Sequence, residues 1–150
     1  MKIKNVTSKD LREIYSLEKK VFKENAFSKT LLKKSINNST FFLKLEKDTF
    51  RKVNIGFVIA VRDRLDRVNI INFLINPKYQ NMGYGAYLLE NTIKRIEQLK
   101  GIKQIVLNVQ VNNLRAINLY HKFGFKIIEK IDHYYRSREN AYLMILSIKP

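Results

Sequence analysis

The chain has 150 residues, 45% of them hydrophobic, and a formal net charge of +16, which fits one globular domain over residues 1–150. It has no cysteine, which excludes disulfides and thiolate metal sites, and we expect no metal site of another kind. No apolar run reaches the about 18 residues of a membrane span, and residues 1–10 lack the apolar core of a signal peptide. We therefore expect a cytoplasmic protein without a membrane partner.

The positive charge is spread along the chain. The 29 Lys and Arg residues run from Lys2 to Lys149, without a run of five or more basic residues. An evenly basic, solvated surface is the simplest explanation. A surface that attracts anions would also suit a phosphate-rich cofactor or association with the ribosome. Aromatic RNA-recognition motifs are absent, so we expect no sequence-specific binding of nucleic acid.

The first half of the chain predicts a strand, two helices and three further strands. Residues 2–6 favour a short strand. A helix follows, capped by Thr7 with Asp10 three residues later, and its apolar stripe is Leu11, Ile14, Leu17 and Val21. A shorter helix over 27–36 has Ser28 as its cap. Residues 40–47, 54–62 and 68–75 read as strands separated by charged turns.

The second half alternates strands with helices. A helix is expected from about Gly83 to Leu99, with Leu89, Ile93 and Ile96 on one face and Gly101 after its end. Residues 104–111 predict a strand, 113–123 a helix, and 125–131 and 141–148 the last two strands. The order β-α-α-β-β-β-α-β-α-β-β predicts an α/β fold in which one mixed sheet of about seven strands is flanked by about four helices.

Two glycines stand where the strand over 68–75 gives way to the next helix. In "KYQNMGYG", Gly83 and Gly85 remove side chains from a place where unpaired backbone N–H groups and the helix dipole meet. This combination favours a phosphate or pyrophosphate ligand, although glycines before a helix also serve as simple turn residues. A Walker-type loop and the dinucleotide fingerprint are both incomplete here.

Two segments resemble one known family. Gln80–Ala86 is similar to the Q/R-x-x-G-x-G/A pyrophosphate loop of the GNAT acetyltransferases, and Asn112–Phe125 resembles their N-x-x-A-x-x-L-Y-x-x-x-G-F helix. The resemblance implies the GNAT fold, with acetyl-CoA as cosubstrate. Its pantetheine arm would pair with the strand before the loop, and its pyrophosphate would lie on the loop amides. The cofactor-binding residues so implied are Phe73, Leu74, Ile75, Gln80, Asn81, Met82, Gly83, Tyr84, Gly85, Ala86, Asn113, Ala116 and Tyr120.

The segment Ile131–Leu146 resembles the tail of N-terminal protein acetyltransferases, both the ribosomal-protein alanine enzymes and the archaeal and eukaryotic nascent-chain enzymes. The resemblance implies that Tyr134 and Tyr135 bind the backbone of a substrate's first residues. It also implies that Phe22 forms a wall of the acceptor pocket. Simpler explanations are one core and one surface tyrosine, and an apolar residue that closes the first helix.

The family resemblance assigns the proton-transfer groups only in part. Tyr120 matches the tyrosine that donates a proton to the leaving thiolate. Many relatives carry Glu or His where this chain has Asn108, which cannot take a proton at neutral pH. Glu24 and Tyr79 are the substitute candidates for the base, and His133 is a weaker third.

Together these features predict an acetyl-CoA-dependent Nα-acetyltransferase that acts on protein or peptide N-termini by direct attack in a ternary complex. The alternatives are a GNAT enzyme for a small amine such as a polyamine, one for lysine side chains, and a non-catalytic acyl-CoA-binding or ribosome-associated module. The last remains open because Asn108 stands at the usual position of the base.

Overall fold

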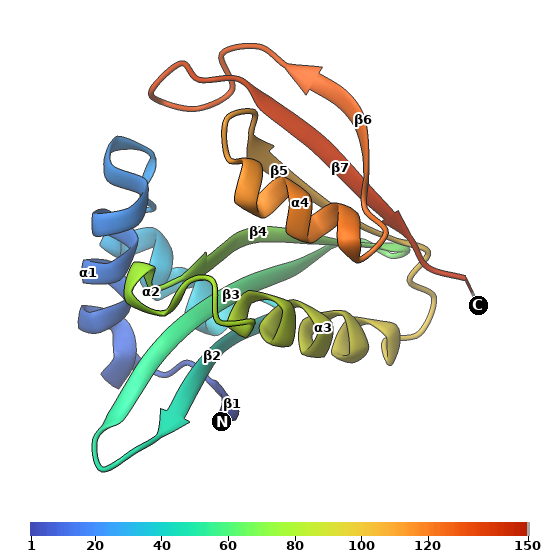
Figure 1. The fold of residues 1–150 in the computed structure, drawn as a ribbon. Helices are drawn as coiled ribbons and strands as arrows, with labels where there is room; N and C mark the ends of the chain where they lie inside the picture. The colour runs from blue at the N-terminus through green and yellow to red at the C-terminus, as the bar shows by residue number, and fades with distance from the viewer. Residues whose placement is uncertain (150) are drawn as a thin grey trace.

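The computed structural model describes residues 1–149, which form a seven-stranded sheet and four α-helices. Figure 1 shows how these elements are arranged. The α/β fold and the order of its elements agree with the sequence prediction. The strands and helices are β1 (Lys2–Asn5), α1 (Leu11–Phe22), α2 (Lys29–Asn38), β2 (Phe41–Asp48), β3 (Lys52–Arg64), β4 (Arg67–Ile75), α3 (Tyr84–Glu97), β5 (Gln104–Gln110), α4 (Leu114–Lys122), β6 (Lys126–Ile131) and β7 (Ala141–Ser147). Short 3₁₀ turns cover Ser8–Asp10, Lys23–Asn25 and Pro77–Tyr79.

The starts of α1 and α2 follow the predicted capping residues. The Thr7 N–H donates to the Asp10 carboxylate at 2.9 Å, but a 3₁₀ turn lies between them, so α1 begins at Leu11. Asp10 also pairs with Lys44 of β2 at 2.7 Å, which fixes this end of the helix to the sheet. The Ser28 Oγ accepts a hydrogen bond from the Leu31 N–H at 3.1 Å and caps α2.

The sheet has the strand order β1-β2-β3-β4-β5-β7-β6, and β4 and β5 are its only parallel neighbours within residues 1–149. Their ladder runs only from Arg67 opposite Gln104 to Ile70 opposite Leu107. Both strands continue beyond that point, β4 to Ile75 and β5 to Gln110. The two halves of the sheet therefore separate, as Figure 1 shows between β4 and β5.

A β-bulge lies at the point of separation. On β3, Ile59 and Ala60 are consecutive, but their partners on β4 are Asn72 and Ile70, so Ile71 is an extra residue. Before the bulge Ile70 packs on the α3/α4 side of the sheet, and after it Leu74 packs on the α1/α2 side. The extra residue thus bends β4 and exchanges the faces on which its alternate side chains lie.

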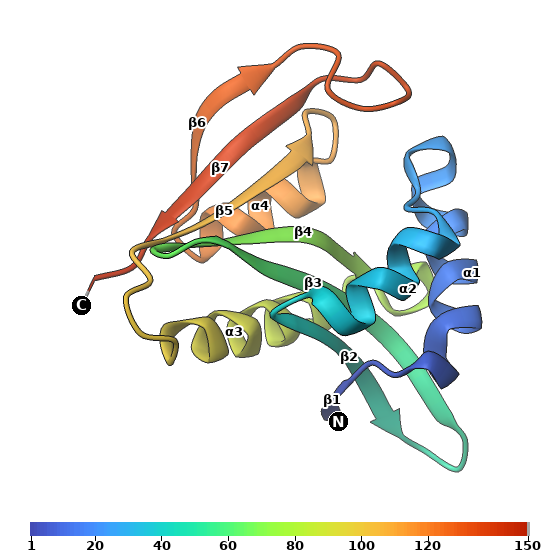
Figure 2. The same ribbon diagram turned by 180° about the vertical axis from the view of Figure 1, so that it is seen from behind.

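The helices cover both faces of the sheet, as Figures 1 and 2 show. Ile14 and Leu17 of α1 and Leu32 of α2 pack with Phe57 and Leu74 on one face. On the other face, α3 and α4 contribute the fully or nearly fully buried residues Leu88, Leu89, Ile93, Ile96, Ile117 and Tyr120. Burial of these apolar side chains at about 25 cal/mol per Å² holds the layers together.

Helices long and apolar enough to traverse a lipid bilayer are not found among residues 1–149.

Candidate active site

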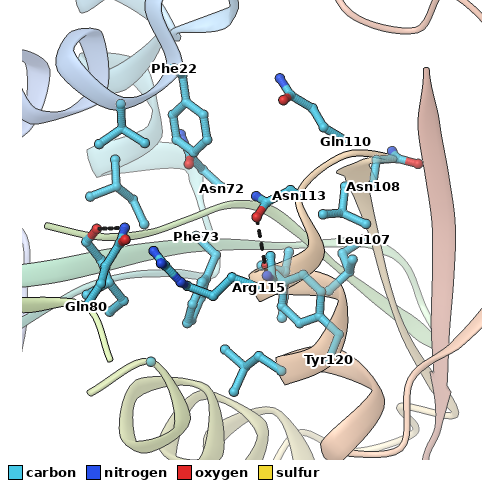
Figure 3. Close-up of a pocket in the computed structure, with 18 of the residues that line it drawn as sticks. Phe22, Asn72, Phe73, Gln80, Leu107, Asn108, Gln110, Asn113, Arg115 and Tyr120 are labelled. Atoms are coloured by element: carbon cyan, nitrogen blue, oxygen red, sulfur yellow. Dashed lines mark hydrogen bonds between the residues drawn. The ribbon is translucent and has the colours of Figure 1, made fainter. Parts of the chain in front are cut away.

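A cavity of about 340 Å³ fills the space where β4 and β5 separate (Figure 3). Its walls are the ends of these two strands, the loop after β4, the start of α4 and the segment after α1. Its residues include the predicted Phe22, Phe73, Leu74, Ile75, Gln80, Asn81, Gly83, Gly85, Ala86, Asn113, Ala116, Tyr120 and Tyr135. One cavity therefore gathers residues from Phe22 to Tyr135, which lie far apart in the sequence.

At one end of the cavity the N-terminus of α3 has free backbone donors. Gly83 is its N-cap with φ +84°, in the left-handed region that favours glycine, and it provides no side-chain cap. The first amide in the helical ladder is that of Tyr87, bonded to the Gly83 carbonyl at 3.1 Å. The three preceding N–H groups, of Tyr84, Gly85 and Ala86, remain for an anionic ligand and lie at the positive end of the helix dipole.

The rest of the glycine loop divides into residues that line the cavity and residues that do not. The Gln80 Nε2 donates to the Ile75 carbonyl at 3.1 Å and closes the loop against β4. Met82 is 62% exposed and lies outside the cavity lining. The Tyr84 side chain also turns away and packs edge-on against Tyr79, with ring centroids 6.4 Å apart. Met82 and Tyr84 can thus contribute only their backbone to a ligand here.

Helix α4 provides the opposite wall. Asn113 is its N-cap, and its Oδ1 accepts from the Ala116 N–H at 3.3 Å. Arg115, which the sequence did not single out, extends into the cavity toward Gln80 in Figure 3 and is the only cation among the described lining residues. Tyr120 lies deeper, 5% exposed, with its ring against Phe73 and Phe125 at centroid distances of 6.1 and 5.7 Å.

Two tyrosines, Tyr120 and Tyr135, line the cavity. Burial, and next the neighbouring Tyr135, raise the pKa of Tyr120 well above its usual range. Burial likewise raises the pKa of Tyr135, with further contributions from Tyr134 and Glu139. Both phenols are therefore protonated throughout the neutral range and can act as hydrogen-bond donors.

The predicted tyrosine pair is divided between two environments. Tyr135 lines the cavity, whereas Tyr134 is 47% exposed and lies outside the lining, with its ring edge-on to Tyr135 at 4.9 Å. The Asn108 Nδ2 donates to the Tyr134 hydroxyl at 3.0 Å, and the Asn108 Oδ1 has no hydrogen-bond partner within residues 1–149. The Tyr134 O–H is consequently left to donate elsewhere.

The segment after α1 and the β6–β7 loop meet beside the cavity. The Asn25 Nδ2 donates to the Ser137 Oγ at 3.0 Å, and the Ser137 N–H donates to the Asn25 Oδ1 at 2.9 Å. Phe22 and Phe27 line the same end. This end is therefore an apolar recess, fixed by two hydrogen bonds between loops 112 positions apart.

The candidate bases lie outside this cavity. Glu24 is exposed in the 3₁₀ turn after α1, where Lys23 with φ +51° reverses the chain, and it does not line the cavity. Tyr79 packs on Tyr84 and the α3/α4 core and also lies outside the lining. His133 is exposed, with its Nδ1 3.2 Å from the Arg138 carbonyl. None of the three side chains is placed among the cavity residues.

A buried carboxylate that the sequence reading missed does line the cavity. Glu18 is fully buried, and its two oxygens accept from the Phe27 N–H at 2.8 Å and the Asn72 Nδ2 at 2.9 Å. It therefore links α1, the segment after α1 and β4. The sequence signal was available, because Glu18 lies four residues after Ile14 and interrupts the apolar side of the helix.

The charge state of Glu18 provides a test of this placement. Burial raises the pKa of Glu18 above its ordinary value of 4.5, although the hydrogen bonds from Phe27 and Asn72 oppose the shift. The folded protein then binds this proton more tightly than the unfolded chain does. The contribution of Glu18 to stability is therefore largest below pH 4.5 and falls as pH rises through the folded-state pKa.

We expect urea unfolding to show this loss, because Glu18→Gln removes the titrating group and keeps the side-chain shape. From pH 4.5 upward, the free energy of unfolding of the wild type should fall relative to that of the variant, by at most about 1.4 kcal/mol per pH unit. Glu13→Gln, an exposed position on the same helix, is the matched control and should not change the slope. Parallel curves for wild type and Glu18→Gln would contradict the assignment.

The sequence model of the acetyltransferase (GNAT) family matches residues 8–125. The chain belongs to this family. The two segments that resemble GNAT motifs, the glycine loop before α3 and the helix after β5, both border the cavity.

Curated relatives of this GNAT protein are named for N-terminal acetylation. An N-alpha-acetyltransferase of Sulfurisphaera tokodaii is 36% identical over 51% of this chain and 46% of its own length. The matched part thus spans about half of that relative. The [ribosomal protein bS18]-alanine N-acetyltransferase of Haemophilus ducreyi is 30% identical over 96% of this chain and 98% of its own length.

Solved structures share the GNAT fold along nearly the whole chain. The ribosomal-protein-S18-alanine N-acetyltransferase of Escherichia coli has a TM-score of 0.85 and 27% identity over 99% of this chain and 94% of its own. Arabidopsis thaliana NAA60, solved with acetyl-CoA, has a TM-score of 0.85 at 18% identity, covering 98% and 99% of the two chains. A chimera of the Vibrio cholerae spermidine N-acetyltransferase has a TM-score of 0.80 at 20% identity, covering 98% and 96%. The last two similarities concern the fold alone.

Proposed function

We propose that this GNAT protein is an acetyl-CoA-dependent Nα-acetyltransferase that modifies the N-termini of proteins or peptides. The observation that carries the proposal is the single cavity that joins the amides at the start of α3 to the apolar recess of Phe22, Phe27 and Tyr135. A donor and an acceptor held at its two ends would meet between β4 and β5. Transfer by direct attack in a ternary complex follows from that arrangement.

Acetyl-CoA would occupy the end of the cavity next to α3. The free amides from Asn81 to Ala86 suit its pyrophosphate, and Arg115 adds the positive charge that two phosphates require. Beyond Ile70 the side of β4 that faces β5 has no ladder partner, so its backbone around Phe73 and Ile75 can pair with the amides of pantetheine. Asn113 and Ala116 of α4 would then border the arm from the other side.

The acceptor end suits a peptide N-terminus better than a polyamine. Glu18 is the only carboxylate among the described lining residues, and both of its oxygens already accept hydrogen bonds. A polyamine carries several cations that would find no free carboxylate here. The Tyr134 and Tyr135 hydroxyls can instead donate to the carbonyls of an extended peptide, while Phe22 and Phe27 surround its first side chain.

The reaction requires a neutral amine and protonation of the departing thiolate. An α-amine has a pKa near about 8, so a useful fraction is neutral at physiological pH. The unpartnered Asn108 Oδ1 is shielded from solvent, and after a rotation of the side chain it can accept an N–H of this amine and orient its lone pair toward the thioester carbonyl. Attack forms the C–N bond, and collapse breaks the C–S bond while Tyr120 gives its proton to the sulfur.

Glu24 and Tyr79 remain candidates to take the proton of the amine. Their positions outside the cavity mean that either would need a water molecule or a movement of its segment to reach the amine. If neither acts, water takes the proton and positioning provides most of the acceleration. The relatives named for ribosomal protein bS18 support protein N-termini as partners and, with them, a cytoplasmic site of action.

The direct test compares acceptors under one condition. The protein is incubated with acetyl-CoA and, separately, with a library of short peptides, the same peptides with blocked N-termini and an internal lysine, and spermidine. We expect mass spectrometry to find one acetyl group on free N-terminal amines and little on the blocked peptides. If spermidine or the blocked lysine peptides react faster than every free peptide, the proposal is wrong.

A further inference from the structure

A second, strongly basic hollow lies away from the cavity of β4 and β5. It has a volume of about 610 Å³ and is bounded by one side of α1, the start of β3 and the turn Pro77–Tyr79. Figure 1 shows α1 alongside this turn. Lys9, Arg12, Lys20 and Lys78 line the hollow, with Glu13 as its single carboxylate among the described residues.

The four cations of the hollow are available to a ligand. All four are exposed, and the six ion pairs formed within residues 1–149 include none of them. Arg12 and Lys20 are eight residues apart, which places them on one side of α1 two turns from each other. Lys78, in the turn after β4, lines the same hollow. Such a predominantly positive concave surface concentrates anions.

The floor of the hollow contains an unused acceptor. Asn54 of β3 is 6% exposed, and its Oδ1 has no hydrogen-bond partner among residues 1–149. A buried amide oxygen without a donor costs free energy, typically about 1–3 kcal/mol. The oxygen is shielded from solvent, so a ligand hydroxyl in the hollow would reach it after a rotation of the Asn54 side chain and would then remove that cost. The complementary ligand therefore carries a hydroxyl donor close to negative charge.

We propose that this hollow binds the ribose–phosphate backbone of RNA. Each ribose carries its 2′-hydroxyl next to a phosphodiester, so the phosphates can lie among Arg12, Lys20 and Lys78 while the hydroxyl donates to Asn54. DNA provides the same charge without the hydroxyl. An acidic peptide carries its carboxylates on side chains away from its backbone donors. Binding is independent of base sequence, because the hollow offers no aromatic platform for bases.

Fluorescence anisotropy tests the proposal with a labelled single-stranded RNA, the DNA of the same sequence and polyglutamate. We expect the RNA to bind more tightly than the other two. The double variant Arg12→Glu/Lys20→Glu should weaken RNA binding by roughly tenfold or more and reduce the salt slope by about 1.4, at about 0.7 per lost phosphate contact. Lys33→Glu/Lys34→Glu on α2, an equal change in net charge at two exposed lysines, is the matched control.

The buried amide has its own test. Asn54→Ala should remove the preference for RNA over DNA and leave DNA affinity within about twofold, because only the hydroxyl contact is lost. Three results would each overturn the proposal: no binding of RNA, polyglutamate binding at least as tightly, or equal losses in the α1 and α2 double variants. Acetylation of peptides by the α1 double variant should remain at the wild-type level. A failure of the RNA-binding proposal can therefore be distinguished from a failure of the acyl-transfer proposal.

Discussion

Gly85→Val is expected to abolish the binding of acetyl-CoA while the protein still folds. A Cβ at this position would lie 3.3 Å from the Leu119 Cδ2 and 3.6 Å from the Ile75 Cγ1, and both neighbours line the cavity. The two methyl groups of valine would occupy the approach to the amides at the start of α3. Isothermal titration calorimetry should show affinity reduced at least about 100-fold, which corresponds to about 2.7 kcal/mol.

Two further variants make this result specific. Gly85→Ala adds only the Cβ, so the loss should be smaller than for valine. Glu90→Val places the same side chain on the exposed side of α3 and should leave affinity unchanged. Circular dichroism shows whether each variant folds. Undiminished binding of acetyl-CoA by a folded Gly85→Val protein would remove the loop from the cofactor site.

Tyr120→Phe is expected to lower kcat by about 10²-fold or more, with little change in the KM of the peptide or acetyl-CoA. The substitution removes one hydroxyl and retains the ring contacts with Phe73 and Phe125. Because burial raises the pKa of Tyr120, its proton is present across the working range, and a higher pH should not rescue the variant. Initial rates from pH 6 to about 9.5 measure this directly.

The two base candidates serve as comparators in the same series. Since Glu24 and Tyr79 lie outside the cavity, we expect Glu24→Gln and Tyr79→Phe to reduce kcat by no more than about twofold. A larger defect that shrinks above about pH 9, where the α-amine is already neutral, would identify that residue as the base. A Tyr120→Phe enzyme with more than half of the wild-type kcat would refute proton donation by Tyr120.

The sequence predicted the elements and the glycine loop because their signals are local. Ser28 caps α2 and Gly83 begins α3 through contacts within one turn, and both positions are visible in the sequence. The exposure of Glu24 depends instead on Lys23, which adopts a positive φ. A lysine in the sequence gives no signal of such a backbone conformation. The reversed chain turns Glu24 to solvent, while Glu18 six residues earlier lies in the cavity wall.

Other site features arise only from long-range contacts. The Tyr134 hydroxyl accepts a hydrogen bond from Asn108, which lies 26 positions away. The helical periodicity of the sequence places Arg115 at an exposed position of α4. Its side chain reaches the cavity because α4 faces the loop that contains Gln80. Neither the pairing of side chains nor the direction of the arginine can be derived from periodicity.

Because of the extra residue Ile71, substitutions and deletions in β4 should have different effects on the bulge. Every substitution there leaves the length of the strand unchanged, so we expect a substitution scan to retain the bulge. Deletion of Ile71 would restore regular alternation with Phe73 and Leu74 still on their present faces, and β4 could continue its ladder with β5. The opening of the sheet is thus encoded by the number of residues between Ile70 and Asn72, and variation in length rather than in side-chain chemistry would close it.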